Sequence, residues 1–191
     1  MDNEKAIMLM FNNTSVIGEQ RHSNNWNIIN GYSNSENPLD ILAVAVSYER
    51  EGAEYRKKAI DYYEKFLENP SEIPVVPNLI GTNGKPIRCI SLWQIYSSLA
   101  DLYEKEYEFK NAIKYLKKLP KESGYKNSAD YTRVGNVLAK IDINECVKYY
   151  EDLMTKPAYQ KFKRQIDICY SNALEKQSKG YVFKPRKTTK K

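Results

Sequence analysis

The residue types that carry most enzyme chemistry are sparse in this sequence. Its 191 residues include one histidine, His22, and three cysteines, Cys89, Cys146 and Cys169. A nucleophilic Cys–His pair would need His22 beside one of these thiols. Cys146 and Cys169 fall among apolar residues at helical spacing, where a thiol usually acts as a small core residue. We therefore expect no catalytic or metal-binding thiol.

Motifs that mark catalysis or cofactor binding are also missing. The sequence contains no Cys-x-x-Cys pair, no His-Glu-x-x-His and no phosphate-binding glycine loop. Gly81 and Gly84 lack the Lys-Ser/Thr pair that such a loop needs. Acidic residues gather at 49–54 and 104–108, where helix ends are expected, and such clusters are usually solvated surface. The sequence predicts a protein that is not an enzyme and binds neither metal nor cofactor.

Composition and the absence of targeting signals limit the classes of protein to which this sequence can belong. A chain of this length forms one domain or two small ones. No run approaches the roughly 18 apolar residues that a membrane span needs. The chain begins Met1-Asp2-Asn3-Glu4, which is acidic where a signal peptide is basic. With three scattered cysteines a disulfide scaffold is not expected either, so we expect a cytoplasmic protein with no membrane partner.

Apolar periodicity predicts seven helices after an irregular N-terminal segment. Residues 12–37 are rich in Asn and Ser, which compete with the helical backbone through local hydrogen bonds. The short apolar run Ala6–Phe11 before them is expected to be either a helical turn or a small strand. From Pro38 onward apolar residues recur every three or four positions, and Gly and Pro mark the ends of these runs. Helices are expected over about residues 38–51, 59–69, 92–103, 112–119, 131–141, 146–156 and 157–178, the fourth closed by Pro120 and the last by Gly180.

An insertion separates the second and third of these helices. Residues 70–89 contain four prolines and two glycines, which exclude a helix. Val75-Val76 and Ile87 flank Asn83-Gly84, a tight-turn signal, and are expected to form a small hairpin. Because Val75, Val76, Leu79 and Ile80 are apolar, we expect this loop to be ordered and packed on a neighbouring unit.

Helix pairs recur at a nearly constant period. Ala112 and Cys146 are 34 positions apart, and Ala100 and Gly135 are 35 apart. The tetratricopeptide repeat has a period of about 34 residues and a sparse pattern of small and large residues. The middle unit resembles that pattern through Tyr96, Leu99, Ala100 and Tyr103, then Ala112, Leu116 and Leu119 before Pro120. Two further units resemble it less closely, through Ile41, Val44, Ala45, Tyr48, Ala59, Tyr63 and Phe66, and through Tyr131, Val134, Gly135, Leu138, Cys146, Tyr150 and Leu153. A generic helical bundle remains the alternative.

The resemblance implies an all-α fold, a right-handed superhelical stack of antiparallel helix hairpins of the TPR-like α-solenoid type. Its units would span about 38–70, 90–120 and 128–156, with a capping helix at 157–178, the insertion at 70–89 and a basic tail at 179–191. Ala100, Ala112 and Gly135 should be buried at helix crossings, where a larger side chain would separate the axes.

The resemblance also implies a function. Tetratricopeptide arrays bind peptides or partner proteins in a concave groove lined by the first helix of each unit. Here the matching positions are Leu42, Val46, Gln94, Ser97, Asp101, Thr132, Asn136 and Lys140. Arg133 and Asn136 suggest the clamp with which part of the family holds a terminal carboxylate, but Leu42 and Val46 stand where that clamp has Lys and Asn. The first hypothesis is therefore an adaptor or scaffold that binds a protein or peptide.

The charge distribution supports an alternative, nucleic-acid binding. Residues 1–155 carry a net charge of −3 and residues 156–191 a net charge of +9. Basic side chains neutralise phosphates, and exposed rings such as Tyr181 and Phe183 can stack on bases. The last eight residues hold five of the basic side chains, Lys184, Arg186, Lys187, Lys190 and Lys191. A solubilising tail is the simpler reading, because the acidic body would repel a polyanion.

Overall fold

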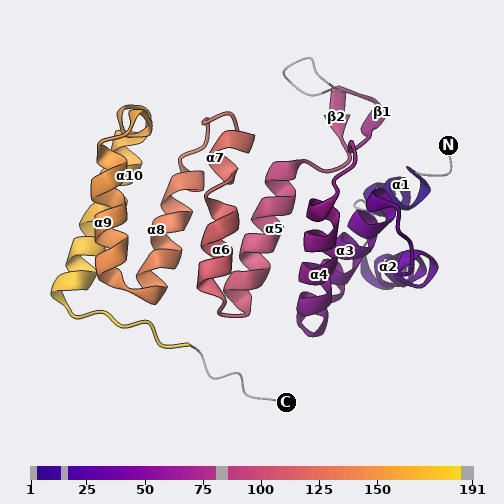
Figure 1. The fold of residues 1–191 in the computed structure, drawn as a ribbon, viewed down its shortest axis with the longest axis horizontal. Coiled ribbons are helices and arrows are strands. Elements are labelled where there is room, and N and C mark those ends of the chain that lie inside the picture. The colour runs from indigo at the N-terminus through magenta and orange to yellow at the C-terminus, as the bar shows by residue number, and fades with distance from the viewer. Residues whose placement is uncertain (1–3, 14–16, 81–85, 186–191) are drawn as a thin grey trace. The chain divides into compact units, whose positions relative to one another are not determined.

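The computed structural model describes residues 4–13, 17–80 and 86–185, and most of them are helical (Figure 1). The helices are α1 (Lys5–Asn12), α2 (Gly18–Tyr32), α3 (Pro38–Glu51), α4 (Arg56–Glu68), α5 (Leu92–Lys105), α6 (Phe109–Leu116), α7 (Leu119–Glu122), α8 (Ala129–Ile141), α9 (Ile143–Met154) and α10 (Pro157–Ser178), with a turn of 3-10 helix at Ala53–Tyr55. Two short strands, β1 (Val75–Ile80) and β2 (Pro86–Arg88), pair antiparallel. The predicted all-α class is confirmed, with one small hairpin added. Within the described ranges, no helix combines the length and the apolar character needed to cross a membrane.

The chain folds as two compact units, residues 1–95 and 96–191. In the first unit α3 is central, and α1, α2 and α4 all pack against it. Every residue of α3 from Leu39 to Tyr48 is buried, as a helix covered on all sides requires. The predicted start of this helix is confirmed, because the Asn37 side chain accepts a hydrogen bond from the Leu39 N–H and Pro38 follows at the first helical position.

The prediction of an irregular segment over residues 1–37 is wrong, although the helical alternative for Ala6–Phe11 is confirmed by α1. Helices α1 and α2 occupy most of it and bury Ile7, Ile28 and Ile29. Burial of these apolar side chains against α3 outweighs the low helix propensity of the asparagines.

The asparagines themselves link the helices of this unit. Asn13 Nδ2 donates a 2.7 Å hydrogen bond to Asn25 Oδ1, and Asn25 Nδ2 donates a 2.7 Å bond to Glu51 Oε1. Glu51 also contacts the imidazole of His22. Asn13 and Asn25 are buried, and each is hydrogen-bonded as burial requires. Their side chains therefore connect the ends of α1 and α3 through α2 and do not break a helix.

The small hairpin predicted in the insertion is confirmed by the pairing of β1 with β2, in which Val75 lies opposite Arg88. The Arg88 guanidinium donates hydrogen bonds to the Ile73 carbonyl and to Glu72. The predicted turn at Asn83-Gly84 lies outside the described residues. The side chains of Val76, Leu79 and Ile80, which were predicted to pack on a neighbouring unit, also lie outside them. Val75 itself is 45% exposed.

In the second unit the helices stand side by side, with α6 against α8, α8 against α9 and α9 against α10 (Figure 1). Tyr115 of α6 stacks on both Tyr96 and Tyr103 of α5, with ring centroids 6.1 and 5.9 Å apart. Helices α8 and α9 are joined through Asp142, whose side chain caps α9 by accepting from the Asn144 N–H. The predicted hairpins α5–α6 and α8–α9 are therefore present, while membership in the tetratricopeptide family stays a prediction.

One helix boundary in this unit differs from the prediction. Helix α6 ends at Leu116, and Pro120 lies in the first turn of the short helix α7 instead of closing the fourth helix. A proline fits the first turn of a helix because its missing N–H would have no helical partner there. The Pro120 signal therefore marked the start of a helix and not an end.

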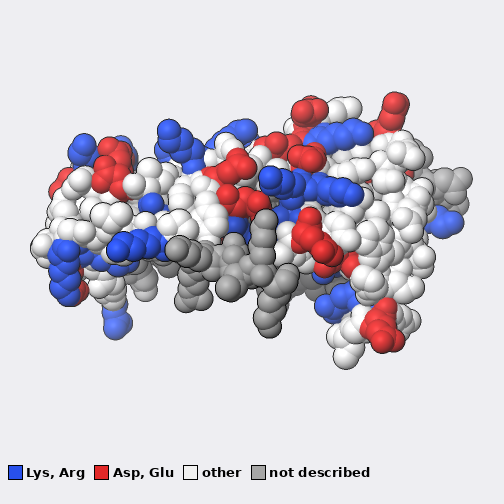
Figure 2. Space-filling view, turned by 90° about the horizontal axis from the view of Figure 1, so that it is seen from below, with Lys and Arg blue, Asp and Glu red and all other residues white. Residues whose placement is uncertain are grey.

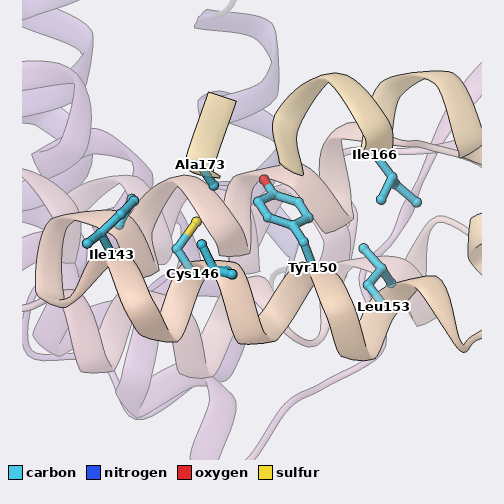
Figure 3. Close-up of a cluster of buried hydrophobic side chains, with 8 residues drawn as sticks. Ile143, Cys146, Tyr150, Leu153, Ile166 and Ala173 are labelled. Carbon is cyan, nitrogen blue, oxygen red and sulfur yellow. The ribbon is translucent and has the colours of Figure 1, made fainter. Parts of the chain in front are cut away.

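Helix α10 covers the far side of this unit and has the predicted bounds. Ile143, Cys146, Tyr150 and Leu153 follow one face of α9 and meet Ile166 and Ala173 of α10 (Figure 3). This cluster buries the apolar face of the last hairpin, which is the role expected of a capping helix.

The small residues lie where they were predicted. Ala100 and Ala112 have no exposed surface, and Gly135 is buried. A Cβ atom added to Gly135 would lie 2.3 Å from the Tyr150 Oη, closer than real Cβ contacts allow. The Tyr150 ring therefore occupies the space that any side chain at position 135 would need.

We predict that Gly135→Ala destabilises the protein by roughly 1–3 kcal/mol, because the new methyl group must displace a buried ring. Urea unfolding of the full chain measures this change. Gly31→Ala is the matched control, since a Cβ there has no neighbour within 4 Å. The control should be neutral or stabilising by up to about 1 kcal/mol, as expected for Gly replaced by Ala in a helix. An equal stability of wild type and Gly135→Ala would contradict the packing of Tyr150 on Gly135.

Candidate interaction face

Helices α5 and α8 are joined by paired polar side chains. Arg133 of α8 donates hydrogen bonds of 2.8 Å to Ser97 Oγ and of 2.6 Å to Asp101 Oδ1 of α5. Two turns further along α8, Lys140 pairs with Glu104 of α5. We call the surface formed by Ser97, Asp101, Glu104, Arg133, Asn136 and Lys140 the α5–α8 face.

The ion pairs of this face are too exposed to water to add much to the stability of the fold. The Asp101 side chain is 50% exposed and that of Arg133 is 25% exposed. Ion pairs with such exposure stabilise a fold by about 0–1 kcal/mol. Asn136 is exposed between Arg133 and Lys140 along α8, and its amide can both donate and accept hydrogen bonds. These groups are therefore positioned to exchange hydrogen bonds with another molecule.

Leu42 and Val46, the predicted groove residues of the first unit, do not line an open surface. They are 0% and 5% exposed, within the fully buried stretch of α3. The prediction is wrong for them because helices α1 and α2, which the sequence pattern did not indicate, pack against α3.

Gln94 and Thr132 were also predicted to line the groove, and both have other roles. Gln94 Oε1 accepts from the Ser91 N–H at 2.8 Å, and Ser91 Oγ accepts from the Gln94 N–H at 3.2 Å. This reciprocal pair is a capping box that starts α5. The backbone carbonyl of Thr132 accepts a hydrogen bond from the Tyr150 hydroxyl.

Glu104 was missed by the sequence analysis although a signal was present. It lies 36 positions before Lys140, the same separation as between Ser97 and Arg133, which are hydrogen-bonded. A repeat that places two helices side by side brings residues at that separation into contact. One surface therefore brings together five of the predicted residues and Glu104. The five are Ser97, Asp101, Arg133, Asn136 and Lys140.

Aromatic side chains lie at the end of the α5–α8 face that holds Lys140. The Lys140 Nζ lies 5.8 Å from the ring centroid of Phe109 and 5.6 Å from that of Phe183, within cation–π range. Tyr107, Phe109 and Lys140 together form what we call the aromatic site. Phe183, predicted as a ring available for base stacking, packs into this site.

Two of the three cysteines, Cys89 and Cys146, are buried in settings that suppress their reactivity. Burial raises the pKa of the Cys146 thiol to about 11 and also raises the pKa of Cys89. A thiol that stays protonated at neutral pH is a poor nucleophile and a poor metal ligand. The prediction that Cys146 is a core residue is confirmed by its burial. Among the described residues, no group of three or more His, Cys, Asp and Glu side chains is placed to hold a metal ion.

Comparisons with known proteins are sparse. No family model matches the sequence, and no curated protein matches it. Among solved structures the chain is similar to one described as the crystal structure of MamA, with 16% sequence identity and a TM-score of 0.44. That match covers 84% of this chain and 88% of the other. A likeness of this degree assigns no function.

We predict that the three thiols react with iodoacetamide at different rates at pH 8. A thiol with a pKa of about 11 is roughly a hundredfold less ionised there than one with the ordinary value near 9, and burial slows Cys146 further. Cys169, which is partly exposed, should be modified first. Peptide mass spectrometry measures each site, with urea-unfolded protein as the control in which all three react. Fast modification of Cys146 in the folded protein would contradict its burial.

Proposed function

We propose that this protein is a protein-interaction module, an adaptor or scaffold, that binds a peptide or partner protein on the α5–α8 face. The observation that carries the proposal is the ladder from Ser97 and Asp101 through Arg133 to Glu104 and Lys140. It orders charged and hydroxyl groups on a partly exposed surface without contributing much to stability. Preordered polar groups lose less conformational entropy when a partner binds.

The chemistry of the face favours a polypeptide as the partner. A peptide offers both N–H donors and C=O acceptors, and the face offers carboxylates, a guanidinium, an ammonium and an amide to match them. Basic and acidic side chains are interspersed over the surface viewed in Figure 2. A nucleic-acid surface would instead present a continuous basic stripe along which phosphates could lie.

Nucleic-acid binding is the alternative proposal and would depend on the basic tail. The five basic side chains of residues 184–191 supply it with charge. The aromatic rings that could have stacked on bases, Tyr181 and Phe183, instead pack within the second unit. This arrangement favours the protein-binding proposal.

The test uses the full-length chain as bait to identify a partner, which is then purified for affinity measurement. We predict that Asp101→Ala/Asn136→Ala lowers the affinity by roughly 10–30-fold, the loss of two hydrogen bonds at about 1 kcal/mol each. The free energy of unfolding should change by no more than about 1 kcal/mol.

Glu145→Ala/Lys148→Ala is the matched control for that pair of substitutions. Glu145 and Lys148 form an exposed ion pair of 3.7 Å on α9, away from the α5–α8 face. The control should bind the partner as wild type does. If both double variants bind equally well, the partner does not use the α5–α8 face.

Removal of the basic tail also distinguishes the protein-binding proposal from the nucleic-acid alternative. Truncation after Phe183 removes five basic residues and lowers the net charge from +6 to +1. We predict that partner binding is unchanged by this truncation and that neither form binds a single-stranded oligonucleotide at physiological ionic strength. Binding that is lost on truncation, and that weakens with salt by a logarithmic slope of about −0.7 per phosphate, would favour the nucleic-acid alternative.

A further inference from the structure

The segment after α10 returns to the body of the second unit instead of leaving it. Helix α10 ends in a Schellman motif, in which the N–H groups of Gly180 and Tyr181 donate to the carbonyls of Gln177 and Lys176, each at 3.0 Å. Gly180 has φ +63°, the left-handed conformation that this motif requires. From there the described chain runs along the lower ends of the helices of this unit (Figure 1).

The side chains of this segment alternate between the protein and solvent. Tyr181 packs against the apolar cluster of α8, α9 and α10, and Phe183 packs in the aromatic site. Val182, between them, is 73% exposed, and Lys184 is exposed. Alternation with a period of two is the signature of an extended chain with one face bound. Residues 181–184 thus lie on the protein as a docked peptide would.

The aromatic site holds Phe183 by ring and cation contacts. The Phe183 ring meets Phe109 edge to face at 5.4 Å and lies 6.4 Å from Tyr107, centroid to centroid. These separations lie in the favourable range for aromatic pairs. Beside these rings is an open pocket of about 390 Å³ with room for further side-chain atoms, lined by Tyr107, Glu108, Phe109, Lys110, Asn111 and Ile141.

The backbone of Tyr107 has a conformation that usually selects glycine. Tyr107 occupies the left-handed position of a second Schellman motif, with φ +62° and with the Glu108 N–H donating to the Tyr103 carbonyl at 2.8 Å. Glycine usually fills that position, because a Cβ atom is disfavoured in this conformation. Non-glycine residues in such conformations gather at functional sites. Here the side chain forms one wall of the aromatic site.

We propose that the aromatic site, together with the apolar cluster of α8, α9 and α10, binds extended protein segments that carry two aromatic side chains two residues apart. Phe183 in the aromatic site and Tyr181 on the apolar cluster occupy these two places in cis as a competing ligand. The proposal deepens the proposed function and rests on it for its biological role. Lys140 connects the two surfaces, because its ammonium pairs with Glu104 of the α5–α8 face and lies over Phe183. While residues 181–184 occupy the site, a partner segment can bind only to the molecules in which the site is free. The apparent affinity for that segment is therefore lowered in proportion to the fraction of free sites.

The first experiment tests the cis contact without any partner. Two-dimensional NMR of the full chain follows the side-chain signals of Lys140 and Phe109, which ring currents from Phe183 shift. Phe183→Ala should move these signals toward their unstacked values, and Val182→Ala, the exposed neighbour, should leave them in place. Equal spectra for the two variants would overturn the docking of the tail.

The second experiment tests binding in trans. A peptide of residues 179–185, Lys-Gly-Tyr-Val-Phe-Lys-Pro, is titrated into wild type and into the Phe183→Ala chain. The variant should bind it about five- to tenfold more tightly than wild type, because the cis competitor has been removed. A control peptide with Ala at both aromatic positions should not bind. Equal affinity of the two chains, or of the two peptides, would overturn the proposal.

The Tyr107→Gly variant tests the aromatic site while leaving the fold intact. Glycine suits the left-handed backbone, and this gain offsets the lost ring contacts and the greater entropy of the unfolded chain, so the variant should unfold within a few degrees of wild type. In the Phe183→Ala chain it should nevertheless reduce peptide binding at least fivefold, and undiminished binding would overturn the role of Tyr107. Neither titration involves the partner of the α5–α8 face. A failure of that proposed function, seen as Asp101/Asn136 variants that bind normally, is therefore distinguishable from a failure of the aromatic site.

Discussion

The close approach of α8 and α9, which depends on the missing side chain at Gly135, determines how α8 is oriented. The Tyr150 ring fills the space beside Gly135 and its hydroxyl donates to the Thr132 carbonyl, so the helix is held both by shape and by a hydrogen bond. With about 100° of rotation per residue, Arg133 and Lys140 then point away from α9 and toward α5. The polar α5–α8 face is thus a consequence of one small residue on the opposite side of the helix.

The fold was predictable where local signals and burial agree. Helix α10 begins at Pro157 and ends before Gly180, and α3 begins after Asn37, because each boundary has a residue whose backbone chemistry favours it. Helix α2 was not predictable from propensity, since Asn disfavours a helix interior unless its side chain finds partners. Those partners, such as Glu51 for Asn25, lie far along the chain and are brought close only by the tertiary fold.

The candidate site was predictable only in the second unit. Asp101 and Lys140 were identified from the repeat register, and Arg133 from its likeness to a carboxylate clamp. The contacts between α5 and α8 follow from the register. The same register led to Leu42 and Val46, which are buried because helices absent from any repeat pattern pack on α3. The docking of Phe183 has no local signal apart from the aromatic alternation after Gly180, because its ring contacts with Tyr107 and Phe109 join residues more than seventy positions apart.

The segment after α10 joins two chemistries that respond differently to the solvent. Tyr181 and Phe183 are held by apolar and aromatic contacts, which salt screens little, whereas the residues from Lys184 onward are mostly basic and interact over a distance set by ionic strength. Pro185 favours an extended backbone at Lys184, which leads the chain onward from the aromatic site. A partner segment that displaces Phe183 would therefore replace its contacts with Phe109 and Lys140, and salt should affect that exchange little.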